Sequence, residues 1–205
     1  MKKNSSYKKL LVFFWTFLVV ILMFPATVVA VEKNAYFAGG CFWCMEHDFE
    51  DISGVISVES GYSGGVLLNP NYENHNGHQE SVNVTYNPKI ISYEELLKVY
   101  WRNIDPLDGQ GQFCDRGDSY RPMIFTNDLS EDKAARISLE DIAKELKKPQ
   151  KDVKVGIQRF TRFWMAEDYH QDFANRNSLK YNFYRFTCGR DNRLDELWGE
   201  RAYQD

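Results

Sequence analysis

The sequence is poor in the features that define several classes of protein. Only four of its 205 residues are cysteines, which is too few for a small domain held together by a framework of disulfides. It has no excess of basic residues, and the net charge of −4 argues against a nucleic-acid binder with a broad basic surface. It has no internal repeat, low-complexity tract or linker, which favours one domain. The composition is otherwise globular, with 43% hydrophobic and 15% aromatic residues.

The first thirty residues differ from the rest of the chain. Residues 1–9 carry four lysines and no acid, residues 10–24 form an uncharged apolar run, and small residues suited to cleavage follow up to Ala30. This order is typical of a secretory signal peptide, because the run is short for a membrane span of about 20 residues. We therefore expect residues 1–30 to be a signal peptide, with an N-terminal membrane anchor over residues 10–30 as the alternative.

Either form of this leader would place residues 31–205 outside the cytoplasm, in the periplasm or the extracellular space. Cysteines in such a compartment can pair unless a reductant keeps them reduced. We expect residues 31–205 to form one exported domain, with the membrane as a partner only if the leader stays uncleaved.

The pattern of apolar residues alternates between strands and helices along this domain. Strands are predicted at residues 35–38, 55–62, 80–86, 122–125 and 153–160. Helices are predicted at residues 41–51, 130–147, 167–176 and 191–198. A further helix is predicted to begin at a capping box formed by Ser92 and Glu95. The order indicates an α+β fold: a ferredoxin-like two-layer sandwich with a mixed or antiparallel sheet and flanking helices. Two long loops, 63–77 and 105–119, are of the length that often carries function.

Two cysteines lie together in the segment 39–44, GGCFWC. The glycines allow a tight turn, and Cys41 then lies at the start of the predicted helix, where free N–H groups and the helix dipole lower the pKa of a thiol. Cys44 lies one turn along on the same face, within reach of a disulfide. The pair is therefore predicted to be a nucleophile and its partner, against two alternatives: small buried hydrophobes or a structural disulfide.

Five short motifs, taken together, resemble one family. They are AGGCFWCME (38–46), GYSGG (61–65), GHQESV (77–82), CDRGDSYR (114–121) and AEDYHQ (166–171). In this order they resemble the peptide methionine sulfoxide reductase A family, over nearly the whole of residues 31–205. The resemblance implies a ferredoxin-like α+β sandwich and the reduction of methionine S-sulfoxide, free and in proteins, to methionine, in repair of oxidatively damaged exported proteins.

The resemblance also implies roles for two reactive residues. Cys41 would attack the sulfoxide sulfur and become a sulfenic acid as methionine leaves. Glu80 would supply the proton for the departing oxygen, which requires a carboxyl that stays protonated near neutral pH. Without the resemblance, a solvated glutamate at a strand end is the more common reading of Glu80.

Five further residues match the family's site. Tyr62 and Tyr120 match its two tyrosines, whose hydroxyls hydrogen-bond the sulfoxide oxygen, and Asp115 matches an aspartate at the polar end of the site. Phe42 and Trp43 match the pocket that receives the methyl group. The alternatives are core packing for the aromatic residues and a turn position for Asp115.

The cysteine that resolves the sulfenic acid stays open at this stage. The family often has glycine at the position of Cys44, with recycling cysteines in a flexible tail near the C-terminus. Here Cys44 has the local geometry, Cys188 precedes a predicted helix instead of a loose tail, and Cys114 allows relay schemes. We favour Cys44, followed by Cys188.

The resemblance implies no bound cofactor and no metal, with reducing equivalents supplied by a thioredoxin-like protein. A zinc site that combines the cysteine pair with His75 and His78 is the weaker reading, because the spacing is loose and the pair lies in a helix. The leading alternative function is a general exported CxxC thiol–disulfide oxidoreductase. A non-catalytic binding protein is the third.

Overall fold

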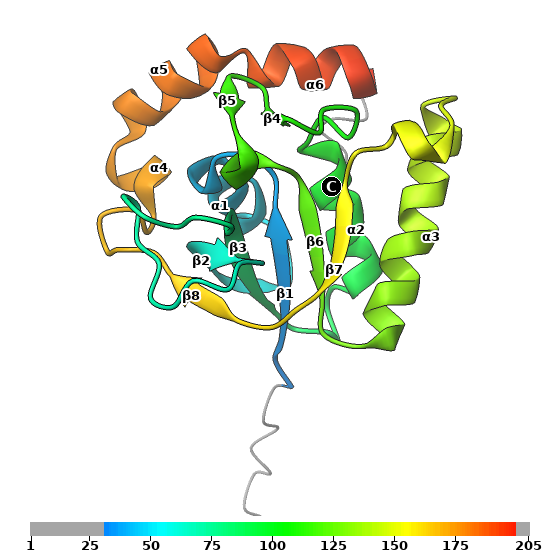
Figure 1. Ribbon diagram of the computed structural model, residues 1–205, viewed down its shortest axis with the longest axis horizontal. Helices are drawn as coiled ribbons and strands as arrows, with labels where there is room; N and C mark the ends of the chain where they lie inside the picture. Colours follow the sequence, from blue (N-terminus) through cyan, green and yellow to red (C-terminus); the bar gives the residue numbers. More distant parts are fainter. Residues whose placement is uncertain (1–30, 200–205) are drawn as a thin grey trace, which may run out of the picture.

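The computed structural model describes residues 31–199, and the predicted leader lies outside the described residues. Its centre is a six-stranded mixed sheet in the order β7-β6-β1-β3-β2-β8, with one parallel pair, β6 with β7 (Figure 1). The strands are β1 Lys33–Ala38, β2 Val55–Ser63, β3 Gln79–Tyr86, β6 Met123–Thr126, β7 Gly156–Arg159 and β8 Phe163–Met165. The helices are α1 Phe42–Glu50, α2 Tyr93–Arg102, α3 Leu129–Glu145, α4 Phe173–Arg176, α5 Ser178–Cys188 and α6 Arg190–Trp198. The predicted α+β class is confirmed.

One face of the sheet carries the main core, and Phe37 of β1 shows how the helices cover it. Its ring lies 5.3 Å from that of Phe49 on α1 and 5.1 Å from that of Tyr100 on α2. The Tyr100 hydroxyl donates a hydrogen bond to the carbonyl of Ala38 at 2.9 Å, at the end of the strand. Burial of these large rings stabilises the layer and fixes where β1 ends, which is also where the site begins.

The opposite face is covered by an extended segment instead of a helix. Tyr36 stacks on Phe160 with ring centroids 3.8 Å apart and packs against Phe163, the first residue of β8. Successive residues of a strand point to opposite faces, so Phe37 and Tyr36 anchor the two layers from adjacent positions.

Several predicted elements have the expected place, and others do not. The capping box of α2 is present, with the backbone N–H of Glu95 donating to Ser92 Oγ at 3.2 Å. The predicted helix at 167–176 shrinks to α4, and α3, predicted to begin at residue 130, begins at Leu129 with Asp128 as its cap. Ile137, an apolar residue of the helix predicted at 130–147, is 49% exposed, so the apolar residues of that helix do not all face the core.

Four of the strands and helices are absent from the predictions. The three-residue strand β8 exists through its pairing with β2, which no local pattern reveals. Helix α5 has its large apolar residues turned to solvent, so its periodicity does not identify a buried face. Loop 105–119 also contains a small two-stranded ladder, β4 Gly111–Gln112 and β5 Asp115–Arg116.

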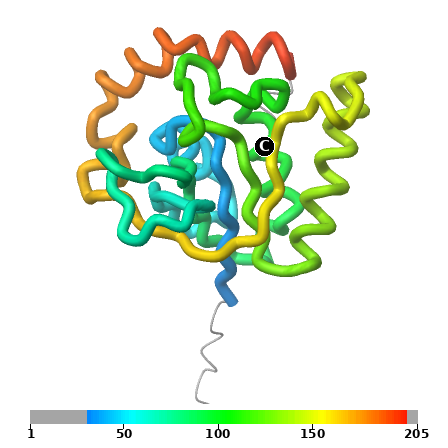
Figure 2. The backbone as a smooth tube through the Cα atoms, in the orientation of Figure 1, coloured from blue at the N-terminus to red at the C-terminus, as the bar shows by residue number. Residues whose placement is uncertain are grey.

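The last helices form an arm, defined here as α5 and α6, residues 178–198. Figure 2 shows this arm, orange to red, passing over one end of the molecule. Among residues 31–199, no helix has the length and apolarity needed to cross a membrane.

Candidate active site

The turn between β1 and α1 positions Cys41. Gly40 has a φ of 87°, and a Cβ there would lie 2.7 Å from Cβ of Gln112, so both the backbone shape and the close approach require glycine. Cys41 caps α1, and its carbonyl accepts hydrogen bonds from the N–H groups of Cys44 and Met45 at 3.1 and 3.3 Å. The thiol therefore lies at the helix start, as predicted.

Arg190 of α6 holds this turn from behind. Its side chain is buried, and its guanidinium donates to the carbonyls of Gly39 at 3.4 Å and Asn103 at 2.6 Å. It also pairs with Asp48 of α1 at 3.3 Å. A buried guanidinium with these partners fixes the arm, α1 and the glycine turn relative to one another.

A small cavity of about 60 Å³ opens over Cys41. The residues that line it come from α1, β3, loop 63–78, the 115–120 segment and α5: Cys41, Phe42, Trp43, Tyr72, Glu80, Asp115, Tyr120 and Tyr184. The structure thus brings together most of the residues selected from the sequence, over a space suited to a small group. Tyr72 and Tyr184 were not selected.

The structure corrects the placement of Tyr62. Its ring is fully buried beside Phe42, at 5.9 Å, and its hydroxyl donates to Glu167 Oε2 at 3.1 Å, away from the cavity lining. Glu167 Oε1 accepts from the backbone N–H of Tyr72 at 2.9 Å, so Tyr62 supports the loop that carries the lining tyrosine. The sequence feature that could have identified Tyr72 is its position, as an aromatic residue within the long loop 63–77.

Glu80 lies at the floor of the cavity with 1% of its surface exposed. Its Oε2 accepts a hydrogen bond from the N–H of Phe42 at 3.1 Å. Burial raises the pKa of this carboxyl to about 8, with a smaller contribution from the negative charge of Asp115, while the hydrogen bond from Phe42 opposes the shift. Glu80 therefore carries a proton at neutral pH and can donate it.

The two thiols of the segment 39–44 form a buried, hydrogen-bonded pair. Burial raises the pKa of Cys41, contrary to the expectation from the helix start, because removal from water outweighs the helix dipole. The hydrogen bond with Cys41 lowers the pKa of Cys44, and the charge of Arg190 acts in the same direction. Both cysteines are free thiols.

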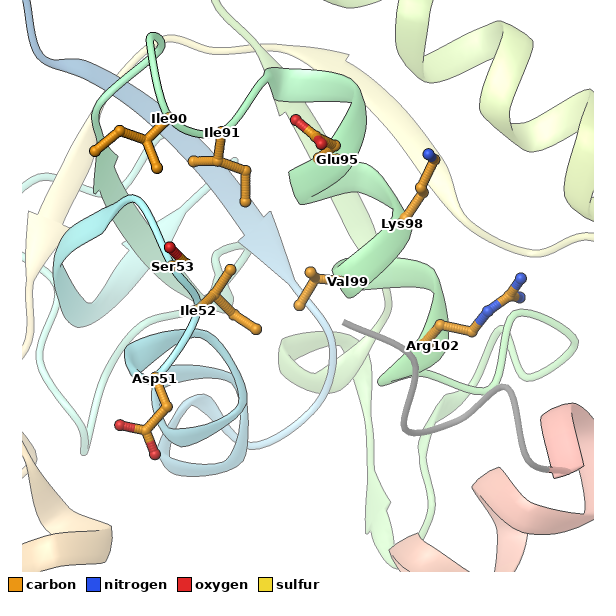
Figure 3. Close-up of a pocket in the computed structure, with 9 residues that line it drawn as sticks. All are labelled: Asp51, Ile52, Ser53, Ile90, Ile91, Glu95, Lys98, Val99 and Arg102. Carbon is orange, nitrogen blue, oxygen red and sulfur yellow. The ribbon is translucent and has the colours of Figure 1, made fainter.

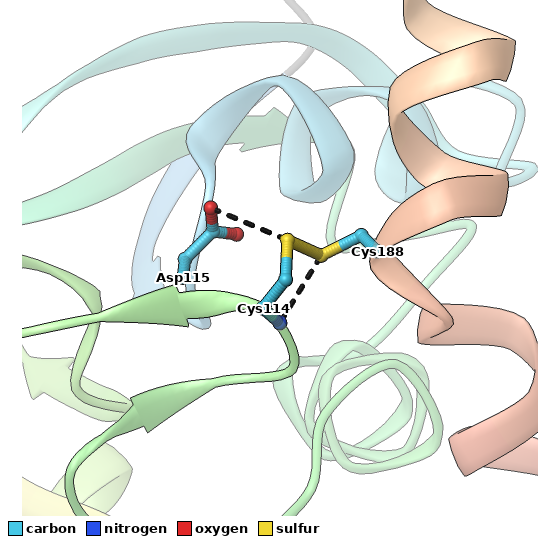
Figure 4. Close-up of side chains that lie close together, drawn as sticks. All are labelled: Cys114, Asp115 and Cys188. Carbon is cyan, nitrogen blue, oxygen red and sulfur yellow. Dashed lines mark hydrogen bonds between the residues drawn. A yellow bond between two sulfur atoms is a disulfide. The ribbon is translucent and has the colours of Figure 1, made fainter.

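The other two cysteines are joined to each other. A disulfide connects Cys114, which directly precedes Asp115, to Cys188 at the end of α5 (Figure 4). Cys188 therefore does not present a thiol to Cys41, as the second of the expected resolving schemes would need. Beside the disulfide, the Tyr184 hydroxyl donates to Asp115 Oδ2 at 2.6 Å.

The residues considered for zinc have other tasks. His78 accepts from the N–H of Gly65 at 3.2 Å and lies 2.9 Å from the carbonyl of Leu67, and His75 bonds the carbonyl of Asn71. Within residues 31–199, the one group with the spacing of a metal site is Cys114, Asp115 and Cys188, whose sulfurs are bonded together.

A larger hollow of about 550 Å³ lies elsewhere, along α2 and the turn after α1 (Figure 3). Its walls are aliphatic side chains such as Ile52 and Ile91 with charged groups at the rim, among them Lys98 and Arg102. Its lining contains no thiol or histidine.

Comparison with known proteins now bears on this geometry. The family model described as peptide methionine sulfoxide reductase matches residues 33–202. The chain belongs to this family. It is 48% identical to peptide methionine sulfoxide reductase MsrA 2 of Caulobacter vibrioides, over 85% of this chain and 90% of the relative. It is 44% identical to MsrA 2 of Rhizobium meliloti, over 91% and 94%.

Solved structures agree with this membership. Methionine sulfoxide reductase A of Corynebacterium diphtheriae has a TM-score of 0.65 and 29% identity, over 72% of this chain and 76% of that one. Reduced Mxr1 of Saccharomyces cerevisiae has a TM-score of 0.67 and 26% identity, over 73% and 88%. The activity of this reductase is the thiol-dependent reduction of methionine sulfoxide, and the general CxxC oxidoreductase is not favoured.

Proposed function

We propose that Cys41 is the nucleophile of a peptide-methionine (S)-S-oxide reductase. The Cys41 thiol gives up its proton as its sulfur attacks the sulfoxide sulfur. The S=O bond and the transient bond between the two sulfurs then break, and the oxygen takes up one proton and ends bonded to the Cys41 sulfur. The products are methionine, reduced by two electrons, and Cys41 sulfenic acid, oxidised by two. The observation that carries this is the cavity over Cys41, which a protonated Glu80 shares.

Glu80 supplies the proton to the oxygen as it leaves the methionine sulfur. The hydroxyls of Tyr72 and Tyr120 supply hydrogen bonds to the negative charge on that oxygen, since both rings line the cavity. Burial raises the pKa of both tyrosines, so they remain donors at neutral pH. The rings of Phe42 and Trp43 form the apolar wall against which the methyl group packs.

Trp43 is held for this task. Its indole N–H donates to His170 Nδ1 at 3.0 Å, and its ring stacks on Phe173 at 3.7 Å. Both partners come from the segment before α5, so the methyl-binding wall is fixed by residues far along the chain. A rigid wall lowers the ordering cost of binding a small apolar group.

Cys44 resolves the sulfenic acid. Its thiol attacks the Cys41 sulfur, the S–O bond breaks, and water leaves as the Cys41–Cys44 disulfide forms. The support is that Cys44 is the free thiol hydrogen-bonded to Cys41. A thioredoxin-like dithiol then returns both cysteines to thiols; the yeast relative Mxr1 has been solved in complex with Trx2.

The site of action that we propose is outside the cytoplasm. Residues 1–30 have the basic, apolar and small-residue order of a signal peptide, with a membrane anchor over residues 10–30 as the alternative. The test is the N-terminal sequence and the fractionation of the expressed full chain. Cleavage near residue 30 with export supports the signal peptide, and a full-length cytoplasmic product contradicts both forms.

Single-turnover methionine release tests the assignment of the cysteines. Cys41→Ser should release no methionine from methionine S-sulfoxide. Cys44→Ser should release one methionine per enzyme but lose recycling by a dithiol reductant. Full multiple turnover by Cys44→Ser would exclude Cys44 as the sole resolving residue. An insulin-reduction assay on the same preparations should be negative, in contrast to a general oxidoreductase.

A further inference from the structure

Two connections join the same two segments on one side of the cavity. Cys114 directly precedes Asp115, and Tyr184 precedes Cys188 by one helical turn on the same face of α5. The disulfide joins the outer residues of these pairs, Cys114 and Cys188, at a Cα separation of 5.0 Å. The hydrogen bond from Tyr184 to Asp115 joins the inner ones at 2.6 Å. Asp115 and Tyr184 both line the cavity.

Helix α5 buries little apolar surface of its own. Tyr181 is its only buried residue, and Arg185 pairs with Asp48 at 2.6 Å. Its outer face leaves three large apolar side chains in solvent: Leu179, Phe183 and Phe186 are 88%, 70% and 79% exposed. A helix with so small a buried surface gains little from packing, so a covalent connection has a large share in positioning it.

The state of the four sulfurs separates two tasks. Cys41 and Cys44 are thiols in hydrogen-bond contact, while Cys114 and Cys188 are already bonded to each other. A bonded pair has no thiol to offer to a sulfenic acid on Cys41. The reaction proposed above needs only the thiols of Cys41 and Cys44, and it does not require the second disulfide to open.

We propose that the Cys114–Cys188 disulfide is a fixed positioning device, which holds Tyr184 against Asp115 in the wall of the substrate cavity and is not opened and closed in turnover. Tyr184 is the positioning residue through which it acts. This inference rests on the proposed function. It assigns the tyrosine and the disulfide to substrate binding, and it leaves the electron transfer to Cys41 and Cys44.

The first test counts methionine without an external reductant. Fully reduced wild type, with four thiols, and the double variant Cys114→Ala/Cys188→Ala are each mixed with excess methionine S-sulfoxide. Both should release one methionine per enzyme. Two from wild type and one from the double variant would overturn the proposal, because the second dithiol would then have reduced the Cys41–Cys44 disulfide.

The second test separates binding from chemistry. Wild type with its Cys114–Cys188 disulfide closed and two titratable thiols is compared with the double variant in single turnover at rising substrate concentration. The half-saturating concentration should rise about tenfold in the variant, with the limiting rate changed less than about threefold. Unchanged half-saturation, or a limiting rate that collapses, would each overturn the positioning role.

Tyr184→Phe keeps the disulfide and removes the hydrogen bond, so it answers the case in which the double variant folds poorly. It should raise the half-saturating concentration in the wild-type background and have less than half that effect in the double variant, because the two changes act through one contact. Fully additive effects would contradict this. Asn182→Ala, exposed on the same helix, is the matched control and should match wild type.

The outcomes also distinguish this inference from the proposed function. If Cys41 is not the nucleophile, Cys41→Ser keeps activity, whatever the state of the second disulfide. If only the positioning role is wrong, Cys41→Ser is inactive while the double variant binds substrate as wild type does.

Discussion

At the scale of single residues, the chemistry depends on a carboxyl that burial keeps protonated. The pKa of Glu80 is raised from 4.5 to about 8, so the acid needed for oxygen departure is present through the neutral range and is lost above it. The same burial that keeps Glu80 protonated disfavours its charged form, so ionisation of Glu80 lowers the stability of the folded protein.

Replacement of Glu80 by glutamine tests both effects. The rate of methionine formation should fall as the pH rises through about 8 in wild type, and that falling limb should be missing in Glu80→Gln, whose overall rate should be about 100-fold lower. Because the folded-state pKa is the higher one, the free energy of unfolding should fall between pH 4.5 and 8, less steeply in the variant. pH–rate profiles and urea unfolding measure the two effects, and an equal falling limb in both proteins would contradict the role.

A pair of tyrosines provides a second comparison at this scale. Tyr72 lines the cavity, whereas the Tyr62 hydroxyl bonds Glu167. Tyr72→Phe should lower the single-turnover rate about tenfold or more, and Tyr62→Phe less than about threefold, since only the first removes a donor at the reacting oxygen. The reverse order would return the catalytic role to Tyr62.

At the scale of elements, the disulfide closes a long loop. Its cysteines are 74 residues apart in the sequence. A crosslink over this separation lowers the conformational entropy of the unfolded chain by an amount that corresponds to about 4 kcal/mol of stability. Cys114→Ala, Cys188→Ala and the double variant should each lower the free energy of unfolding by a similar amount, in the range of about 2 to 5 kcal/mol. Urea unfolding measures this loss of stability. A single variant as stable as wild type would contradict a stabilising role of the Cys114–Cys188 disulfide.

The elements also show how far the sequence could predict this structure. Helix α1 and strands β1 to β3 follow from local sequence: β1 is a short apolar run that ends at two glycines, and apolar and polar residues alternate along β2 and β3. Helix α5 and strand β8 do not, since one presents its apolar residues to water and the other exists only through its partner strand. The Cys114–Cys188 pairing depends on where α5 docks, so spacing alone left it open.

The site shows the same division. Cys41, Phe42 and Trp43 follow each other at a recognisable helix start, and Glu80 lies in a short motif at the start of a strand. Tyr72 and Tyr184 come from a long loop and an unpredicted helix, and only the tertiary fold brings them over Cys41. Local pattern thus finds the reacting groups, and long-range packing supplies the rest of the wall.

At the scale of the whole molecule, the arm contacts the N-terminal half of the domain through Arg190. Arg190 is fully buried among groups from residues 39–103, so its loss leaves Asp48 with one cationic partner fewer and carbonyls without a donor. Arg190→Met should cost about 3 kcal/mol or more in free energy of unfolding. Arg136→Met, which breaks an exposed pair on α3, should cost less than about 1 kcal/mol and is the control. Similar losses of stability in Arg190→Met and Arg136→Met would contradict a special role of Arg190 in holding the arm.

This arrangement has a consequence for the timing of the protein's own synthesis. Cys41 is synthesised well before Tyr184 and Arg190, which lie more than 140 residues further along the chain. During synthesis the chain therefore carries the thiols of Cys41 and Cys44 before it has Tyr184, which lines the cavity, and Arg190, which holds the turn behind it. A nascent chain that has not yet reached Tyr184 should therefore bind a sulfoxide less well than the folded reductase.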